Sequence, residues 1–143
     1  MALTPGDPLA HRALESLFRA EANVRRRLAS DLDREGLSPT GFFVLVVLQT
    51  AGGELELRAL RRRLQTSKAN ATEVIDTLVA RGLVTRHRLA EDRRAVGIDM
   101  TALGAEVVDR LFPEHTERVQ RAFAVLDEDE KRSLATICRK LAA

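Results

Sequence analysis

The sequence predicts a mainly α-helical fold with one small β-hairpin, an α+β class in which helices dominate. Apolar residues recur at helical spacing over most of the 143 residues, and the period changes to two only between Val84 and Met100. Capping and stop residues separate these segments. With 45% hydrophobic and 31% charged residues, the chain has enough apolar side chains for a core and enough charge for a solvated surface.

Two helices are predicted in the first third of the chain. Apolar residues follow a helical spacing from residue 8 to about residue 34, and Gly36 ends that helix. Ser38 and Pro39 start the next one, because serine accepts from an unpaired amide and proline has none to leave unpaired. Residues 42–48 are apolar on all sides, so this segment is buried. The run also fits a buried strand, but the Ser-Pro start favours a helix.

A helix-turn-helix follows. A short helix extends from about Glu56 to Leu64, and Gln65-Thr66-Ser67 breaks it. Ser67 then caps a second helix that continues to Arg81 and ends at Gly82 in a left-handed cap. The apolar residues of this second helix form one stripe, which fits a single core-facing side: Ala71, Val74, Ile75 and Leu78.

The last part of the chain predicts a hairpin and two helices. Residues 84–89 and 96–100 alternate, and the charged residues 90–94 between them form the tip. A hairpin directly after a helix-turn-helix is a wing. Thr101 caps a helix from about residue 102 to 124, which Pro113 is expected to kink. Asp127 and Glu130 form a capping box for the final helix, whose apolar stripe contains Leu134, Ile137, Cys138 and Leu141.

Positive charge gathers in the middle of the chain. The net charge is only +2, but residues 54–94 contain ten basic and six acidic residues. A localised basic patch is typical of proteins that bind polyanions. An arginine-rich surface without a ligand is the alternative, because the chain prefers arginine to lysine throughout.

These features predict contacts with double-stranded DNA. The polar side of the second helix suits the major groove, and the first helix and the wing offer arginines to phosphates. One of the arginines at the hairpin tip, Arg93 or Arg94, can enter a minor groove, and Asp92 can orient a neighbouring arginine. The predicted contact residues are Arg58, Arg62, Arg63, Ser67, Lys68, Asn70, Thr72, Glu73, Thr77, Arg86, Arg88, Asp92, Arg93 and Arg94.

The stretch from Leu37 to Gly104 resembles the MarR family of bacterial winged-helix transcription regulators. The resemblance rests on motifs in the family's order: Leu37-Ser38-Pro39 with Phe42, Phe43 and Leu45; Thr72 with Val74-Ile75-Asp76, Leu78 and Gly82-Leu83-Val84; Glu91-Asp92-Arg93-Arg94-Ala95; Met100-Thr101-Ala102-Leu103-Gly104; and Phe112-Pro113-Glu114-His115. Three positions depart from the family's usual residues: Gly41, Arg61 and Glu73.

The resemblance implies one domain over residues 1–143, with a winged helix-turn-helix at 37–101. It also implies that residues 8–34 and 102–143 form dimerisation helices. The expected protein is a homodimeric repressor that binds a palindromic operator and responds to a small effector. A pocket near Phe18, Phe42, Phe43 and Phe112 is the hypothesis for that effector. The alternative function is a winged-helix dimer that binds proteins and has lost DNA binding.

Other chemistry is not indicated. No glycine-rich phosphate loop, nucleophile elbow or paired nucleophile and base is visible, so no enzyme activity and no cofactor are expected. His11, His87 and His115 share no ligand spacing, so no metal site is predicted, although a zinc site across a dimer stays an alternative. Cys138 is expected to pack rather than to sense oxidants. No apolar run can span a bilayer and no secretory signal is visible, so we expect a cytoplasmic protein without membrane contact.

Overall fold

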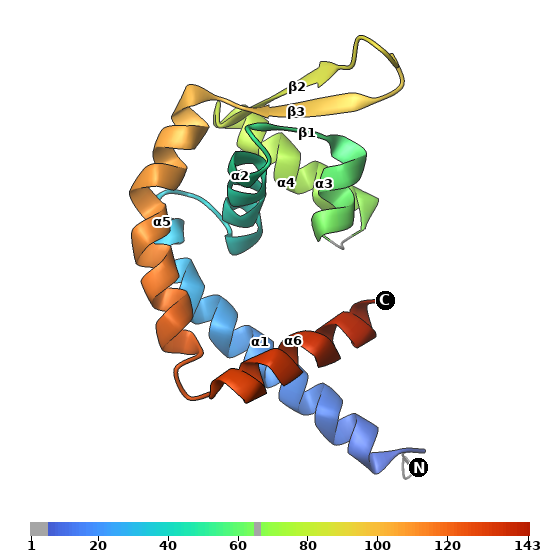
Figure 1. Ribbon diagram of the computed structural model, residues 1–143, viewed down its shortest axis with the longest axis vertical. Helices are drawn as coiled ribbons and strands as arrows, with labels where there is room; N and C mark the ends of the chain where they lie inside the picture. Colours follow the sequence, from blue (N-terminus) through green and yellow to red (C-terminus); the bar gives the residue numbers. More distant parts are fainter. Residues whose placement is uncertain (1–5, 65–66) are drawn as a thin grey trace, which may run out of the picture.

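The computed structural model describes residues 6–64 and 67–143, which form six helices and one antiparallel sheet of three strands (Figure 1). This confirms the mainly helical class with a small β-hairpin. The elements in chain order are α1 (Pro8–Arg34), α2 (Pro39–Thr50), β1 (Glu54–Glu56), α3 (Leu57–Leu64), α4 (Lys68–Ala80), β2 (Val84–Arg88), β3 (Val96–Met100), α5 (Ala102–Ala122) and α6 (Glu128–Ala142).

Helix starts follow the predicted caps. The hydroxyl of Ser38 accepts from the amide of Gly41 at 3.0 Å, and that of Ser67 accepts from Asn70 at 3.1 Å. At the last helix the two halves of the capping box are both formed, with 2.8 Å from the Glu130 amide to the Asp127 carboxylate. Local side-chain chemistry therefore fixes where most helices begin.

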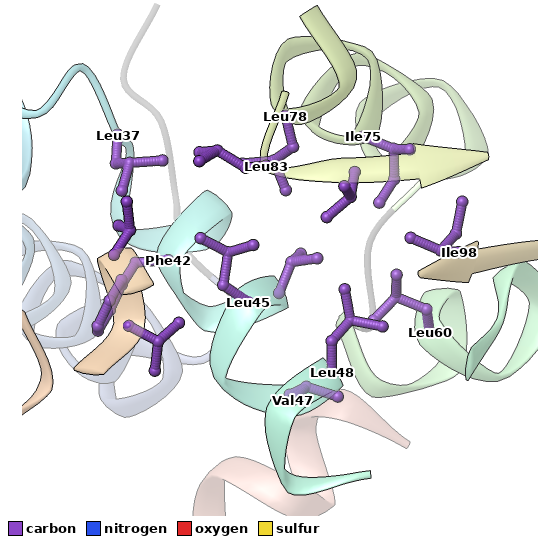
Figure 2. Packing of buried hydrophobic residues seen from close by; sticks show 14 of the residues in the cluster. Leu37, Phe42, Leu45, Val47, Leu48, Leu60, Ile75, Leu78, Leu83 and Ile98 are labelled. Carbon is purple, nitrogen blue, oxygen red and sulfur yellow. The ribbon is translucent and has the colours of Figure 1, made fainter. Parts of the chain in front are cut away.

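The core lies between α2, α3, α4 and the sheet, and α5 closes one side (Figure 2). The segment 42–48 is helical rather than extended, and it lies at the centre of this core. We call α2 to β3 together with the first half of α5 the body. The largest fully buried side chains all belong to it: Phe42, Leu45, Leu48, Leu60, Ile75, Leu78, Ile98, Val44 and Val84.

The sheet differs from the prediction by one strand. Glu54–Glu56 pairs antiparallel with β3, where Glu54 lies opposite Asp99 and Glu56 opposite Gly97, so the strand order is β1-β3-β2. The predicted start of α3 at Glu56 was wrong by one residue, because the backbone of that residue is used in the sheet. Of the predicted turn Gln65-Thr66-Ser67, the first two residues lie outside the described part of the chain.

The two terminal helices extend from the body (Figure 1). α1 packs on α5 through ion pairs of Asp31 with Arg118 and of Glu35 with Arg110. α5 continues through Pro113 without a break and bows as a whole, and it ends at Ala122, two residues earlier than expected. In α6 no residue is buried. Among the described residues, no helix has the length and apolar character needed to cross a membrane.

Candidate nucleic-acid interface

Helix α4 presents one polar face to solvent because its other face is packed in the core. Ala71, Ile75 and Leu78 are at most 1% exposed. The residues on the opposite side are all exposed, and they include every predicted contact residue of this helix: Ser67, Lys68, Asn70, Thr72, Glu73 and Thr77. The structure thus brings the predicted set together on one surface, which we call the α4 face.

The hydroxyl groups on the α4 face have defined hydrogen-bond roles. Thr72 donates to the carbonyl oxygen of Lys68 at 2.8 Å, and Thr77 donates to that of Glu73 at 3.0 Å. Each hydroxyl proton is therefore bonded within the helix, which leaves the hydroxyl oxygen able to accept a hydrogen bond. Ser67 is engaged as the helix cap. Such a threonine can accept a hydrogen bond from a base amino group, and its methyl group can contact a thymine methyl group.

The tip of the hairpin is a tight turn held by its own polar groups. The amide of Ala95 donates to the carbonyl of Asp92 at 3.0 Å. The Asp92 carboxylate accepts from the backbone amide of Arg94 at 3.0 Å. Sequence reasoning expected Asp92 to orient an arginine side chain, but here it fixes the backbone from which the Arg94 side chain projects. The side chains of Arg93 and Arg94 are both exposed.

The two arginines of β2 make hydrogen bonds that stabilise the wing and its position on α4. Arg88 donates to the carbonyl oxygen of Arg93 at 2.7 Å, which braces the tip. Arg86 donates to the Asp76 carboxylate at 2.6 Å and so joins β2 to α4. Both had been predicted only as DNA contacts. Asp76 was missed as a link because its partner lies in another element, and its position on the exposed side of α4 was the available signal.

Helix α3 adds a further set of arginines. Arg58, Arg62 and Arg63 are exposed, as expected for phosphate contacts. Arg61 is half buried, and its Nε is buried without a hydrogen-bond partner among the described residues. The α4 face, the α3 arginines and the wing thus each present exposed polar side chains, most of the charged ones basic.

The four phenylalanines of the effector hypothesis lie in different surroundings. Phe42 is fully buried, with its ring centroid 4.8 Å from that of His115. Phe43 lines a groove between α1 and α2, whereas Phe112 lines a separate groove between α2 and α5. Phe18 is 63% exposed on α1. The structure does not bring the four rings into one pocket.

His115 is a partly buried titratable group that lies against phenylalanine rings. Its ring lies against Phe42 and near Phe112, at 4.8 and 6.5 Å between centroids. Burial lowers the pKa of His115 below its usual value, because the apolar surroundings disfavour the charged imidazolium. Its Nδ1 is buried and has no hydrogen-bond partner within residues 6–64 and 67–143.

A helix-turn-helix followed by an arginine-tipped wing defines a winged-helix DNA-binding protein. The chain belongs to the MarR family, whose model matches residues 37–96. It is 34% identical over 122 residues to the HTH-type transcriptional regulator YkoM of Bacillus subtilis (strain 168), with 85% of this chain and 79% of YkoM covered. The family resemblance is thereby confirmed, and the chain is a MarR-family transcriptional regulator.

Two further comparisons extend this result. The chain is 29% identical over 111 residues to the transcriptional repressor MprA of Escherichia coli (strain K12), with 77% of this chain and 63% of MprA covered. It superposes on the crystal structure of Sco3205, a MarR family transcriptional regulator from Streptomyces coelicolor in complex with DNA, with a TM-score of 0.83 and 26% identity. That alignment covers 99% of this chain and 89% of Sco3205.

Proposed function

We propose that this protein is a cytoplasmic repressor that binds a palindromic DNA operator as a homodimer. The observation that carries the proposal is the joint exposure of the α4 face and the Arg94-tipped wing on one packed body. The Arg86–Asp76 pair holds β2 against α4, so a major-groove reader and a minor-groove reader are linked directly. Repression is proposed because MprA, a relative of this chain, is a repressor.

Dimerisation is supported by the apolar residues that the single chain leaves uncovered. Phe18 on α1 is 63% exposed, and Ile137 and Leu141 on α6 are 54% and 69% exposed. Large apolar side chains exposed along both helices are typical of an interaction surface. A twofold dimer would present two α4 faces, which requires half-sites about one helical turn apart.

The DNA-binding proposal is tested by removing the tip arginine. Fragments bound by the purified protein are selected from the source genome, and affinity for the best fragment is measured by gel shift at fixed salt. Arg94→Ala is expected to weaken binding about tenfold or more, because one groove contact contributes roughly 1–3 kcal/mol. The matched control is Arg139→Ala, which removes the same charge from an exposed position on α6.

Two results would contradict this role. Unchanged affinity of Arg94→Ala would reject the contact at the wing tip. Absence of binding to any fragment, even at low salt, would favour the alternative of a winged-helix dimer that binds proteins. If DNA is bound, the affinity should fall steeply with salt, because phosphate contacts release counterions.

We propose the groove between α1 and α2 as the effector site. It has a volume of about 280 Å³. Val24, Leu28 and Phe43 give it an apolar floor, and Glu21 and Arg25 give it a charged rim. A small aromatic acid fits this combination. A panel of such acids, screened for release of bound DNA, tests the site, and an active compound should lose its effect on the Phe43→Ala variant.

A further inference from the structure

The outer face of the sheet gathers three side chains that can bind a metal ion. Glu54 comes from β1, His87 from β2 and Asp99 from β3. Leu55 and Ile98 pair with each other and face the core, so by strand alternation their neighbours lie on the opposite face. The three strands thus each supply one donor to the same side of the sheet.

The donor atoms are close enough for one ion. One ligand atom from each of the three residues lies within 4.8 Å of the other two. His87 Nδ1 is 3.3 Å from Asp99 Oδ2, a separation close to that between two ligands of a tetrahedral ion with bonds of about 2.0–2.2 Å. Small side-chain rotations would bring Glu54 to the same distance.

Two further observations point to a ligand at this place. Asp99 Oδ1 is buried and has no hydrogen-bond partner in the described part of the chain, an arrangement that is unfavourable unless another group binds the oxygen. The His87 ring lies directly over Gly97, where a Cβ atom would be only 2.6 Å from Cε1 and Nε2. The absence of a side chain at Gly97 therefore lets the imidazole lie against the sheet beside Asp99.

We propose that Glu54, His87 and Asp99 bind one divalent transition-metal ion, with Zn²⁺ as the expected occupant. An imidazole together with two carboxylates favours such an ion over Mg²⁺ or Ca²⁺, which prefer oxygen ligands alone. Water completes the coordination. The sequence alone predicts no metal site, because the three ligands are separated by 33 and 12 residues and no local spacing connects them.

The ion would connect elements that the chain joins only through loops. β1 leads directly into α3, and β2 and β3 form the wing. A metal bound by all three strands would fix the base of the wing relative to the helix-turn-helix. This property is independent of the proposed function, because it concerns a face of the sheet directed away from the core and needs no DNA.

The test is isothermal titration of EDTA-treated, dialysed protein with ZnCl₂ at neutral pH. The wild-type chain should bind one Zn²⁺ per chain, and binding should raise the midpoint of thermal unfolding. Glu54→Gln, which changes an exposed side chain, should bind at least about tenfold more weakly, and His87→Gln and Asp99→Asn should behave in the same way. Gly97→Ala should also weaken binding, because it displaces the His87 ring.

Controls separate this site from other zinc ligands of the chain. His11→Gln and Cys138→Ser remove an exposed imidazole and an exposed thiol, and both variants should bind Zn²⁺ like the wild type. Co²⁺ should give visible absorption in the wild type that is lost in Glu54→Gln. The proposal is overturned if the wild type binds less than one ion per chain, if Glu54→Gln and His87→Gln bind as tightly as the wild type, or if a control variant removes the binding.

Discussion

The body and the terminal helices of this chain differ in how they are stabilised. Every buried hydrophobic side chain among the described residues lies between Leu32 and Leu111, and α1 contributes only Leu32 to that core. On α6, by contrast, no residue is buried. The body is therefore stabilised by its own apolar contacts, whereas the apolar stripes of the terminal helices are largely exposed in the single chain, and we expect a second copy to cover them.

The connection between the two regions contains ion pairs as well as the apolar contact of Leu32. Asp31 pairs with Arg118 and Glu35 with Arg110 where α1 meets α5. The pKa of both carboxyl groups is lowered: that of Asp31 mainly by a hydrogen bond with Glu114 and further by Arg118, and that of Glu35 mainly by the hydrogen bond from Arg110. The Arg110–Glu35 pair has side chains that are 51% and 30% exposed and contributes little stability. The Arg118–Asp31 pair, with side chains 27% and 18% exposed, is screened less by solvent. We expect the stability loss caused by a mutation to depend on protein concentration when the mutation is in a terminal helix, and to be independent of concentration when it is in the body.

The largest effect is expected at the centre of the body. Phe42→Ala removes a fully buried ring, so the free energy of unfolding should fall by about 3–5 kcal/mol. Phe18→Ala makes the same change at a 63% exposed position on α1. Its effect on the free energy of unfolding should stay within about 0.5 kcal/mol in the monomer and grow with protein concentration, because the proposed dimer would bury that ring.

Urea unfolding at several protein concentrations measures both changes. The loss caused by Phe42→Ala should be the same at every concentration, since the core belongs to one chain. A loss below about 1 kcal/mol for Phe42→Ala, or a concentration-independent loss of several kcal/mol for Phe18→Ala, would contradict the division into a self-sufficient body and partner-dependent helices.

The next largest effect is expected on dimer association, when a charge is placed in the apolar stripe of α6. Ile137→Asp places a carboxylate in the surface that we expect a second copy to bury, so the dimer dissociation constant should rise about 100-fold or more. Thr136→Asp is the matched control, because Thr136 is exposed on the opposite side of the same helix. Sedimentation velocity measures the association. Equal self-association of the two variants would show that the stripe is not the interface.

The contact between α5 and the body should make stability depend on pH. Burial lowers the pKa of His115 in the folded chain below the unfolded value, so the unfolded chain binds more protons and stability falls with decreasing pH. This loss should begin near pH 7 and continue through the range below about 6.5, the ordinary histidine value. The losses from Asp31 and Glu35 come at lower pH, below the ordinary carboxyl values of 3.8 and 4.5.

The measurement is urea unfolding at pH 5.5 and 7.5. His115→Gln should remove most of the difference in stability between these pH values, because glutamine does not titrate. His11→Gln changes an exposed histidine on α1 and should leave the difference as it is. If His115→Gln and the wild type show the same pH dependence, the buried imidazole is not its source.

Local signals were sufficient to predict the helices of both regions. Ser38, Ser67 and Thr101 each accept a hydrogen bond from the residue three positions further along the chain, so their effect is visible in the sequence. Gly82 likewise has a φ of 72°, as its predicted role as a left-handed cap requires. The exposure of the α4 face followed from the single apolar stripe of that helix.

Contacts between distant segments could not be predicted in the same way. β1 exists because Glu54–Glu56 pairs with a strand more than forty residues later, and its three residues carry no clear alternation of their own. The partner of Arg86 depends on how β2 packs against α4, and the grouping of His87 with Glu54 and Asp99 depends on the register of all three strands. The effector hypothesis rested on ring type alone, and ring type does not determine which side of α2 a phenylalanine occupies.

The smallest effect on stability is expected at the ion pair that joins α4 and β2 within the body. Asp76 and Arg86 pair at 2.6 Å, but their side chains are 56% and 37% exposed. Asp76→Asn should therefore lower the free energy of unfolding by only about 0.2–1 kcal/mol, and less at high salt. A double-mutant cycle with Arg86→Gln in urea unfolding isolates the pair from the other contacts of each residue. A coupling energy above about 2 kcal/mol would mean that this ion pair contributes as much to stability as the burial of a core side chain does. The stability of the body would then depend on charge as well as on burial.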